Sequence, residues 1–413
     1  MAAAPSKKRI ALFQYNWALQ SYSRDLACKL AETGYHVDFF INNYCFKRRL
    51  IDLASLSDKP GITLHRLENP SPAGWAAKKL NTVLAALPAA LARPLCGDSK
   101  LYRTVRYDTI KKAIHFAAPY HNDYLCCIGI EKPGFLWAGA FAEALQIPLL
   151  YYSLELYIEG HPSIRHYTKM RPHEKKYHRQ AAATIIQDRF RARVLLESNG
   201  VTDQEVLLLP VSVRGPRVTR RSTYFHDKFN LEPDTKIVLY FGRMTKERHY
   251  AELVQTAAAL PENQVMVFHG YGNEKFIARL QAAAPPQKVF FSLDLVPEET
   301  LTELICSADI GLALYDNSIT NDRLTAYASQ KIAQYVQAGV PIIAFQNESY
   351  DDLQNRFRCC ELINAISDIP AAAQTILKNY TAYRNQAFDA YDHSYNFDAA
   401  FVPVKEYIAA RLT

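Results

Sequence analysis

The stretch 329–345, SQKIAQYVQAGVPIIAF, carries the strongest structural signal in the chain. Its first ten residues predict an amphipathic helix with Ser329 in the N-cap position. Gly339 and Pro341 end this helix, and the apolar run 342–345 that follows is typical of a buried parallel strand. The residues alone leave two interpretations open: an ordinary helix–strand unit, or a helix whose N-terminus also binds a phosphate group.

The same stretch resembles the donor-binding motif of GT-B glycosyltransferases, especially the retaining enzymes of glycosyltransferase family 4. The family usually has Glu where this chain has Gln334, and that Glu binds the ribose of the nucleotide. Many members have a second Glu eight residues earlier, where this chain has Ala326; Gln still forms hydrogen bonds but carries no charge. The matching residues are Ser329, Lys331, Gln334, Tyr335, Ala338, Gly339, Pro341, Ile342, Ile343 and Ala344.

Length and element order agree with what this resemblance implies. The 413 residues are enough for two α/β domains of roughly 200 residues each. The prediction is an α/β protein of GT-B architecture, in which two Rossmann-like domains face each other across a cleft. The acceptor domain is expected at 1–212, the nucleotide-sugar domain at 213–385, and a C-terminal helix crossing back to the first domain at 386–413.

Composition limits the protein classes and the compartment. The eight cysteines form no paired C-x-x-C motifs, so we expect no metal site and a reducing compartment. We find no signal peptide and no run of about 18 apolar residues, the length a membrane-spanning helix requires. The sequence therefore predicts a cytoplasmic protein, with peripheral association with membranes as an addition.

The charge is concentrated in the first half of the chain. Residues 1–210 contain 28 Lys and Arg against 18 Asp and Glu, whereas the remainder has a small negative balance. A basic half favours anionic neighbours such as an anionic membrane or an acidic glycan. No nucleic-acid-binding motif occurs, so no nucleic-acid partner is expected. The stretch 75–96 could lie on a membrane interface or form a core-facing helix pair.

The first predicted strand, 9–13, is followed by a loop without glycine. This absence excludes a G-x-G-x-x-G dinucleotide site at this end of the chain. The resemblance implies that the loop lies near the catalytic centre, where aromatic and amide side chains suit a sugar acceptor. Packing within the loop is an equal interpretation. The side chains concerned are Tyr15, Asn16, Trp17 and Gln20.

Two glutamates follow predicted strands of the first domain and are the candidate catalytic residues. Glu131 and Glu155 come after the strands 124–130 and 148–153, and ligands of α/β folds bind beyond the carboxyl ends of strands. Each could orient an acceptor hydroxyl or act as a base, or could be an ordinary solvated carboxylate. A basic segment with four histidines follows. It could form a solvated helix face, or its histidines could bind phosphate or shuttle protons. Its histidines are His161, His166, His173 and His178.

The second domain supplies the candidate donor-binding residues. Gly242 and Arg243 follow the strand 236–241 and match the family's G-R pair, in which Arg contacts the nucleotide diphosphate. Lys246 and Arg248 are alternatives for the family's second cation, with surface ion pairing as the other interpretation. The G-x-G at Gly270 and Gly272 resembles a turn near the donor, and Leu295 lies where the family holds the nucleotide base.

The predicted function is transfer of a sugar from a nucleotide diphospho-sugar to an acceptor hydroxyl. The donor would be a UDP- or GDP-sugar, the acceptor a glycan, glycolipid or small molecule, and the reaction would need no metal. The cations and the helix dipole would stabilise the leaving diphosphate. Two alternatives remain: a catalytically silent GT-B protein that binds a glycan or a partner, and a sugar-nucleotide epimerase.

Overall fold

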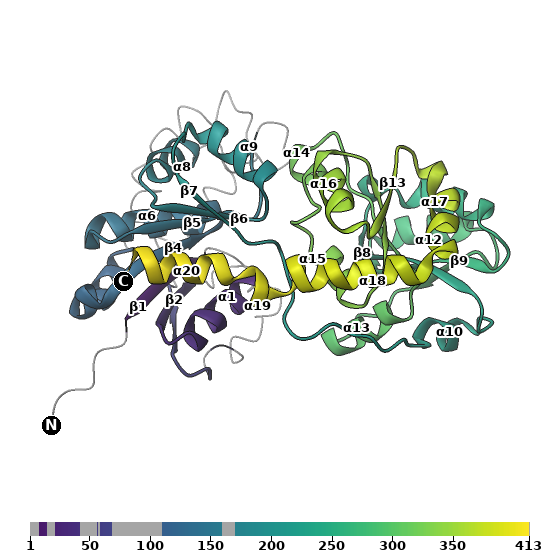
Figure 1. Cartoon of the computed structure of the whole chain (residues 1–413), viewed down its shortest axis with the longest axis horizontal. Helices are drawn as coiled ribbons and strands as arrows, with labels where there is room; N and C mark the ends of the chain where they lie inside the picture. The colour runs from purple at the N-terminus through teal and green to yellow at the C-terminus, as the bar shows by residue number, and fades with distance from the viewer. Residues whose placement is uncertain are drawn as a thin grey trace.

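The computed structural model describes residues 8–14, 21–41, 56, 58–67, 110–158 and 170–412. Two separate parallel sheets, each covered by helices on both faces, make up these residues (Figure 1). Parallel strands buried on both faces need apolar side chains in both directions, and β4, YLCCIGI, is buried at all seven positions. The predicted α/β fold class with two Rossmann-like sheets is confirmed.

The N-terminal sheet has seven parallel strands in the order β3-β2-β1-β4-β5-β6-β7. Its strands are β1 (Arg9–Gln14), β2 (His36–Ile41), β3 (Ile62–Arg66), β4 (Tyr124–Ile130), β5 (Leu149–Tyr152), β6 (Ala183–Ile186) and β7 (Glu205–Leu208). Its α-helices are α1 (Ser21–Glu32), α6 (Glu131–Leu145), α8 (Arg171–His178) and α9 (Arg189–Asn199). The order reverses between β1 and β4, which places the switch point of the sheet there.

The C-terminal sheet has six parallel strands in the order β10-β9-β8-β11-β12-β13, with its switch point between β8 and β11. Its strands are β8 (Lys236–Met244), β9 (Gln264–Gly272), β10 (Val289–Ser292), β11 (Ile310–Ala313), β12 (Ile342–Phe345) and β13 (Cys360–Ile363). Its helices are α10 (Tyr224–Phe229), α11 (Tyr250–Thr256), α12 (Glu274–Ala283), α13 (Glu298–Cys306), α14 (Thr320–Arg323), α15 (Gln330–Gln337), α16 (Glu348–Phe357), α17 (Ile369–Lys378) and α18 (Tyr380–Ala390).

The helix and strand predicted from 329–345 are present as α15 and β12. Gly339 ends the helix with φ of 65°, and a Cβ added there would lie 2.4 Å from the Phe388 ring of α18. Glycine is therefore required for two reasons, the left-handed backbone and the close approach of α18.

The end of the chain returns to the N-terminal sheet. After α18 and a π-helical turn over Tyr391–Tyr395, the helices α19 (Phe397–Ala400) and α20 (Val402–Arg411) run along the first domain (Figure 1). Phe401 and Ile408 are buried in the same apolar cluster as β1 and β4, and the Tyr407 hydroxyl donates to the carbonyl of Ala182 at 3.0 Å. Residues 397–408 thus tie the two sheets together by burial of apolar side chains.

No helix within the described residues is both long enough and apolar enough to cross a membrane. The stretch 75–96, predicted as a membrane-interface element or a core-facing helix pair, lies outside the described residues.

Candidate functional site

Two cationic side chains meet beside the switch point of the C-terminal sheet. The Lys331 Nζ, on the first turn of α15, lies 4.1 Å from the ring centroid of Tyr240 and 5.5 Å from that of Tyr315. The Arg248 guanidinium lies 4.9 Å from the same Tyr315 ring. Burial, together with the charge of Arg248, lowers the pKa of Lys331 to about 7. The two cations share one aromatic wall, and a bound anion between them would relieve their repulsion.

Arg248 is held by a carboxylate of α14. Its Nη1 lies 3.3 Å from Asp322 Oδ2. Burial on its own would lower the pKa of Arg248, but the Asp322 charge together with the neighbouring tyrosines outweighs this effect, and the pKa is raised. Arg248 therefore stays charged and in place beside Lys331. The sequence left Lys246 and Arg248 as alternatives for the second cation. Of these two, only Arg248 lies beside Lys331 in the structure.

The N-terminus of α15 opens onto this cluster. Ser329 occupies the predicted N-cap position, but its side chain makes no capping hydrogen bond. Its hydroxyl instead lies 2.6 Å from the Tyr315 hydroxyl. Gly242 is next to the cluster as well, because a Cβ added there would lie 3.9 Å from Lys331 Nζ. The uncapped first turn, the ammonium and the guanidinium form a site suited to a phosphate or diphosphate.

The G-x-G at Gly270 and Gly272, predicted as a turn, belongs to a strand, so that prediction was wrong. Gly242 lies in β8, and Gly270 and Gly272 lie in β9, where Gly242 pairs with Gly270. Both members of this pair have positive φ, 129° and 142°. A Cβ at Gly270 would approach the Gly242 carbonyl oxygen to 2.0 Å. These glycines let the ends of β8 and β9 lie against each other rather than reverse the chain.

Arg243 and Lys246 lie apart from the Lys331 cluster. Both are exposed and line a separate pocket with residues of α12. The Arg243 side chain makes no hydrogen bond or ion pair within the described part of the chain.

Three apolar side chains at the ends of β9 and β10 are exposed. Leu295, predicted at the position that holds the base, is 76% exposed, and Leu293, directly after β10, and Tyr271, near the end of β9, are exposed as well. His269 pairs with Ser292 across the two strands, so the residues that follow them emerge at one edge of the sheet. Exposed apolar side chains next to a polar site suit a flat aromatic base.

Gln334 and Ala326, which replace the two glutamates of the resembled family, differ in their surroundings. Gln334 is half-buried on α15. Ala326 is fully buried within the core of the C-terminal domain, and its carbonyl accepts a hydrogen bond from Tyr395 at 2.7 Å. A carboxylate at position 326 would thus have to displace packed side chains.

Glu131 begins α6 at the switch point of the N-terminal sheet. Its Oε1 accepts hydrogen bonds from the backbone N–H groups of Leu154, at 2.6 Å, and Glu155, at 2.8 Å. Burial, and secondarily the charge of Glu155, raises the pKa of Glu131 to about 8. Its φ of 59° is in the left-handed region, which is strained for a residue with a side chain. Glu131 is therefore not a solvated carboxylate, and it is mostly protonated at neutral pH.

Glu155 is exposed, and one of its oxygens is held by the other domain. Asn321 Nδ2 of α14 donates to Glu155 Oε2 at 2.7 Å. The Asn321 Oδ1 accepts from the Leu156 N–H at 2.8 Å. The next residue, Asp322, holds Arg248, so α14 contacts both candidate catalytic and candidate donor-binding residues.

Arg191, a residue that sequence reasoning missed, is the centre of this interdomain contact. It is 1% exposed and donates to the carbonyl oxygens of Asn321 and Leu324 at 3.1 and 3.0 Å. It also donates to Asn321 Oδ1 at 3.0 Å and to Gln187 Oε1 at 2.8 Å. Burial lowers the pKa of Arg191, but the guanidinium remains charged because its intrinsic pKa is so high. Only the run of arginines at 189–193 hinted at this role.

One side of α8 is buried, so the solvated-face interpretation of the basic histidine segment does not hold for His178. His178 is fully buried, with its ring nitrogens at 2.7 Å from Thr184 Oγ1 and 2.9 Å from Asn199 Nδ2. Burial lowers its pKa to about 4, so it is neutral at physiological pH. Glu174, in the same helix, forms a buried ion pair with Lys132 at 2.7 Å. His161 and His166 lie outside the described residues, as do Tyr15, Asn16, Trp17 and Gln20.

Within the described ranges, no group of three or more His, Cys, Asp or Glu side chains is arranged to hold a metal ion. The cations of the cluster are the groups available there to balance phosphate charge.

Comparison with known proteins places the fold among glycosyltransferases. No protein-family model matches the sequence, and no curated protein does. HepE of Anabaena, solved in complex with UDP-glucose, is similar over 98% of this chain and 100% of its own, with a TM-score of 0.66 and 10% identity. Sucrose-phosphate synthase of Thermosynechococcus elongatus is similar over 97% and 98%, with a TM-score of 0.64 and 16% identity. The α,α-trehalose-phosphate synthase of Burkholderia xenovorans is similar over 98% and 100%, with a TM-score of 0.62 and 11% identity. The chain therefore has the GT-B fold.

Proposed function

We propose that the protein is a glycosyltransferase that moves a sugar from a nucleotide diphospho-sugar, a UDP-sugar in the first instance, to an acceptor hydroxyl. The observation that carries the proposal is the meeting of Lys331, Arg248 and the uncapped N-terminus of α15 at the β8–β11 switch point. HepE, similar in fold, is solved with UDP-glucose and with UDP, which supports a uridine nucleotide as the first ligand to test.

In this proposal the donor diphosphate lies between the Lys331 ammonium and the Arg248 guanidinium. Gly242 leaves room for it, and Ser329 and the backbone N–H groups of the first turn of α15 contribute hydrogen bonds. The base lies against Leu295 and its exposed apolar neighbours. As the glycosidic bond to the sugar breaks, negative charge grows on the diphosphate, and the fixed cations stabilise it without reorganisation.

The acceptor is proposed to bind on the side of Glu155. Its carboxylate is exposed and is oriented by Asn321, so it can accept a hydrogen bond from an acceptor hydroxyl. Glu131 is proposed as a positioning residue, because a carboxyl with a pKa of about 8 is a poor proton acceptor at neutral pH and its Oε1 already holds the backbone of Leu154 and Glu155. Family 4 membership and retention of configuration are proposed from the resemblance of the 329–345 motif alone.

One observation favours a second candidate, a GT-B protein that binds donor or glycan without transferring sugar. Ala326 is buried where many members of the resembled family place a glutamate, so no carboxylate from that position contacts a donor sugar. An epimerase is less well supported, because His178 is buried and neutral rather than available to move protons.

Calorimetric titration of UDP, UDP-glucose and GDP tests the donor site. A charge-assisted hydrogen bond contributes about 1.5–3 kcal/mol, so Lys331→Met should weaken UDP binding by roughly 10- to 100-fold. Lys378→Met, on an exposed position of α17, is the matched control and should bind UDP as the wild type does. UDP binding that is unchanged in Lys331→Met would refute the assigned site. Release of UDP from UDP-glucose then separates a transferase from a silent binder.

A further inference from the structure

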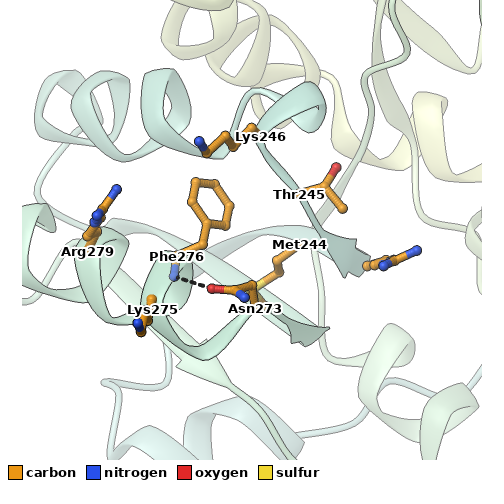
Figure 2. Close-up of a pocket in the computed structure, with 8 residues that line it drawn as sticks. Met244, Thr245, Lys246, Asn273, Lys275, Phe276 and Arg279 are labelled. Atoms are coloured by element: carbon orange, nitrogen blue, oxygen red, sulfur yellow. Dashed lines mark hydrogen bonds between the residues drawn. The ribbon is translucent and has the colours of Figure 1, made fainter.

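A second cationic site lies beyond the carboxyl ends of β8 and β9. It is a pocket of about 400 Å³, called here the basic pocket. One wall comes from the end of β8 and the turn after it, and the other from the first two turns of α12 (Figure 2). Its lining residues are Arg243, Met244, Thr245, Lys246, Asn273, Lys275, Phe276 and Arg279.

The four cations of the basic pocket form no ion pair within the described part of the chain. None of Arg243, Lys246, Lys275 and Arg279 takes part in an ion pair or a side-chain hydrogen bond there. Two acidic residues are neighbours in sequence but do not line the pocket, Glu247 and Glu274. The pKa of Glu247 is lowered first by its own backbone N–H and then by the Thr245 hydroxyl, with Lys246 a smaller influence.

The polar groups around these cations suit a phosphate. The Thr245 hydroxyl at the pocket wall already donates to the Glu247 carboxylate, so the cations and the backbone are the groups available to a ligand. Helix α12 begins there, and Asn273 caps it by accepting from the Phe276 N–H at 3.1 Å, which leaves the earlier N–H groups of the first turn available. The ring of Phe276 adds an apolar surface within the same pocket (Figure 2). Several cations and a helix N-terminus favour a group with two negative charges and several acceptor oxygens.

The basic pocket is distinct from the Lys331 cluster. Lys331 and Arg248 contact Tyr240 and Tyr315 and do not line the pocket. Arg243 and Lys246, which the sequence predicted for the donor, line the pocket and not the cluster.

We infer that the basic pocket binds a phosphomonoester, separately from the donor diphosphate. This inference goes beyond the proposed function and does not require the donor assignment. The ligand is a phosphate group attached to a substrate, or the same group on the headgroup of an anionic lipid. In either case Lys275 and Arg279 recognise it, although neither belongs to the donor site.

Calorimetry with glucose 6-phosphate, inorganic phosphate and glucose tests the inference. The wild type should bind the two phosphates and not glucose, and Lys275→Ala/Arg279→Ala should weaken phosphate binding by at least about tenfold. The same double variant should bind UDP within about twofold of wild type, since 1.4 kcal/mol corresponds to a tenfold change and no donor contact is removed. Lys331→Met should show the reverse pattern.

Vesicles of neutral lipid with and without phosphatidic acid distinguish the two sources of phosphate. If the wild type sediments with phosphatidic acid vesicles and the double variant does not, the ligand is a lipid headgroup. If the wild type binds glucose 6-phosphate but not the vesicles, the ligand is a soluble substrate. Absence of binding to every phosphate probe would overturn the inference. Equal loss of UDP binding in the double variant would also overturn it, because the pocket would then be part of the donor site. If phosphate binds but UDP does not, the proposed function fails while this inference stands.

Discussion

Replacement of Asn321 by alanine should loosen the contact between the two domains. The Asn321 side chain is 7% exposed and makes three hydrogen bonds to the N-terminal domain. Its Oδ1 accepts from the Leu156 N–H and from Arg191, and its Nδ2 donates to Glu155. Alanine removes all three hydrogen bonds and has no polar atom to replace Oδ1 or Nδ2.

The magnitude follows from which groups lose their partner. Arg191 retains the carbonyl oxygens of Asn321 and Leu324, and Glu155 can turn toward water because it is exposed. The Leu156 N–H is buried and loses its acceptor, at a cost of about 1–3 kcal/mol. With the smaller losses at Arg191 and Glu155, we expect the free energy of unfolding to fall by about 2–4 kcal/mol.

Urea denaturation followed by tryptophan fluorescence measures this change. Asn317→Ala is the matched control, because Asn317 is an exposed residue just before α14 whose hydrogen bonds are open to water. The control should change stability by no more than about 0.5 kcal/mol. Small-angle X-ray scattering should also show a larger radius of gyration for Asn321→Ala. A loss of stability no larger than that of Asn317→Ala would refute the reasoning, because the contact would then carry no energy.

Three further outcomes are expected. Because the pKa of Lys331 is about 7, a diphosphate should draw a proton onto the amine, so UDP binding near pH 8 should take up protons in calorimetry across buffers of different ionisation enthalpy. Lys331→Met should abolish this uptake; uptake that persists would assign the proton to another group. The pKa of Glu131 is about 8 in the fold and near its ordinary value in the unfolded chain, so the folded state binds the extra proton between those values. The free energy of unfolding of the wild type should therefore fall as pH rises through this window. That of Glu131→Gln should rise relative to the wild type between about pH 4.5 and about pH 8. A difference between the two proteins that stays constant across the window would contradict the assigned burial of Glu131. Gly270→Ala should destabilise by more than about 2 kcal/mol in urea, because its Cβ would approach the Gly242 carbonyl oxygen to 2.0 Å, whereas at Gly34 an added Cβ meets nothing within 4 Å. Similar losses at both glycines would show that the backbone angle, not the close contact, is responsible.

Local sequence pattern was enough for the elements that carry the fold. Apolar runs bounded by glycine and proline predicted the helix α15 and the strand β12, because helix periodicity and chain breaks are properties of neighbouring residues. The sequence pattern gave a wrong prediction at Gly270 and Gly272, which lie in β9 and not in a turn. A glycine in a sequence indicates that the backbone there can adopt a positive φ. Only the paired strands show that this φ allows β8 and β9 to approach each other closely and does not form a turn.

The sequence predicted some residues of the candidate site, and the structure places others of the predicted residues elsewhere. Lys331 and Arg248 are separated by 83 positions in the sequence and meet because β8 and β11 are neighbours at a switch point. Arg243 carries the same charge and belongs to a family motif, yet it lines a different pocket. The charge of a residue is visible in the sequence, but the direction of its side chain is not.

The sequence by itself determined two Rossmann-like units, the helix and strand of 329–345 that resemble a donor motif, and the absence of a dinucleotide fingerprint, because each depends on residues close together in the chain. Only the tertiary structure decided that Arg191 would be buried against Asn321, 130 residues away, and that Glu131 would hold a proton at neutral pH. Burial and long-range pairing depend on which elements pack together, and desolvation shifts a pKa only after that packing has removed water from the group.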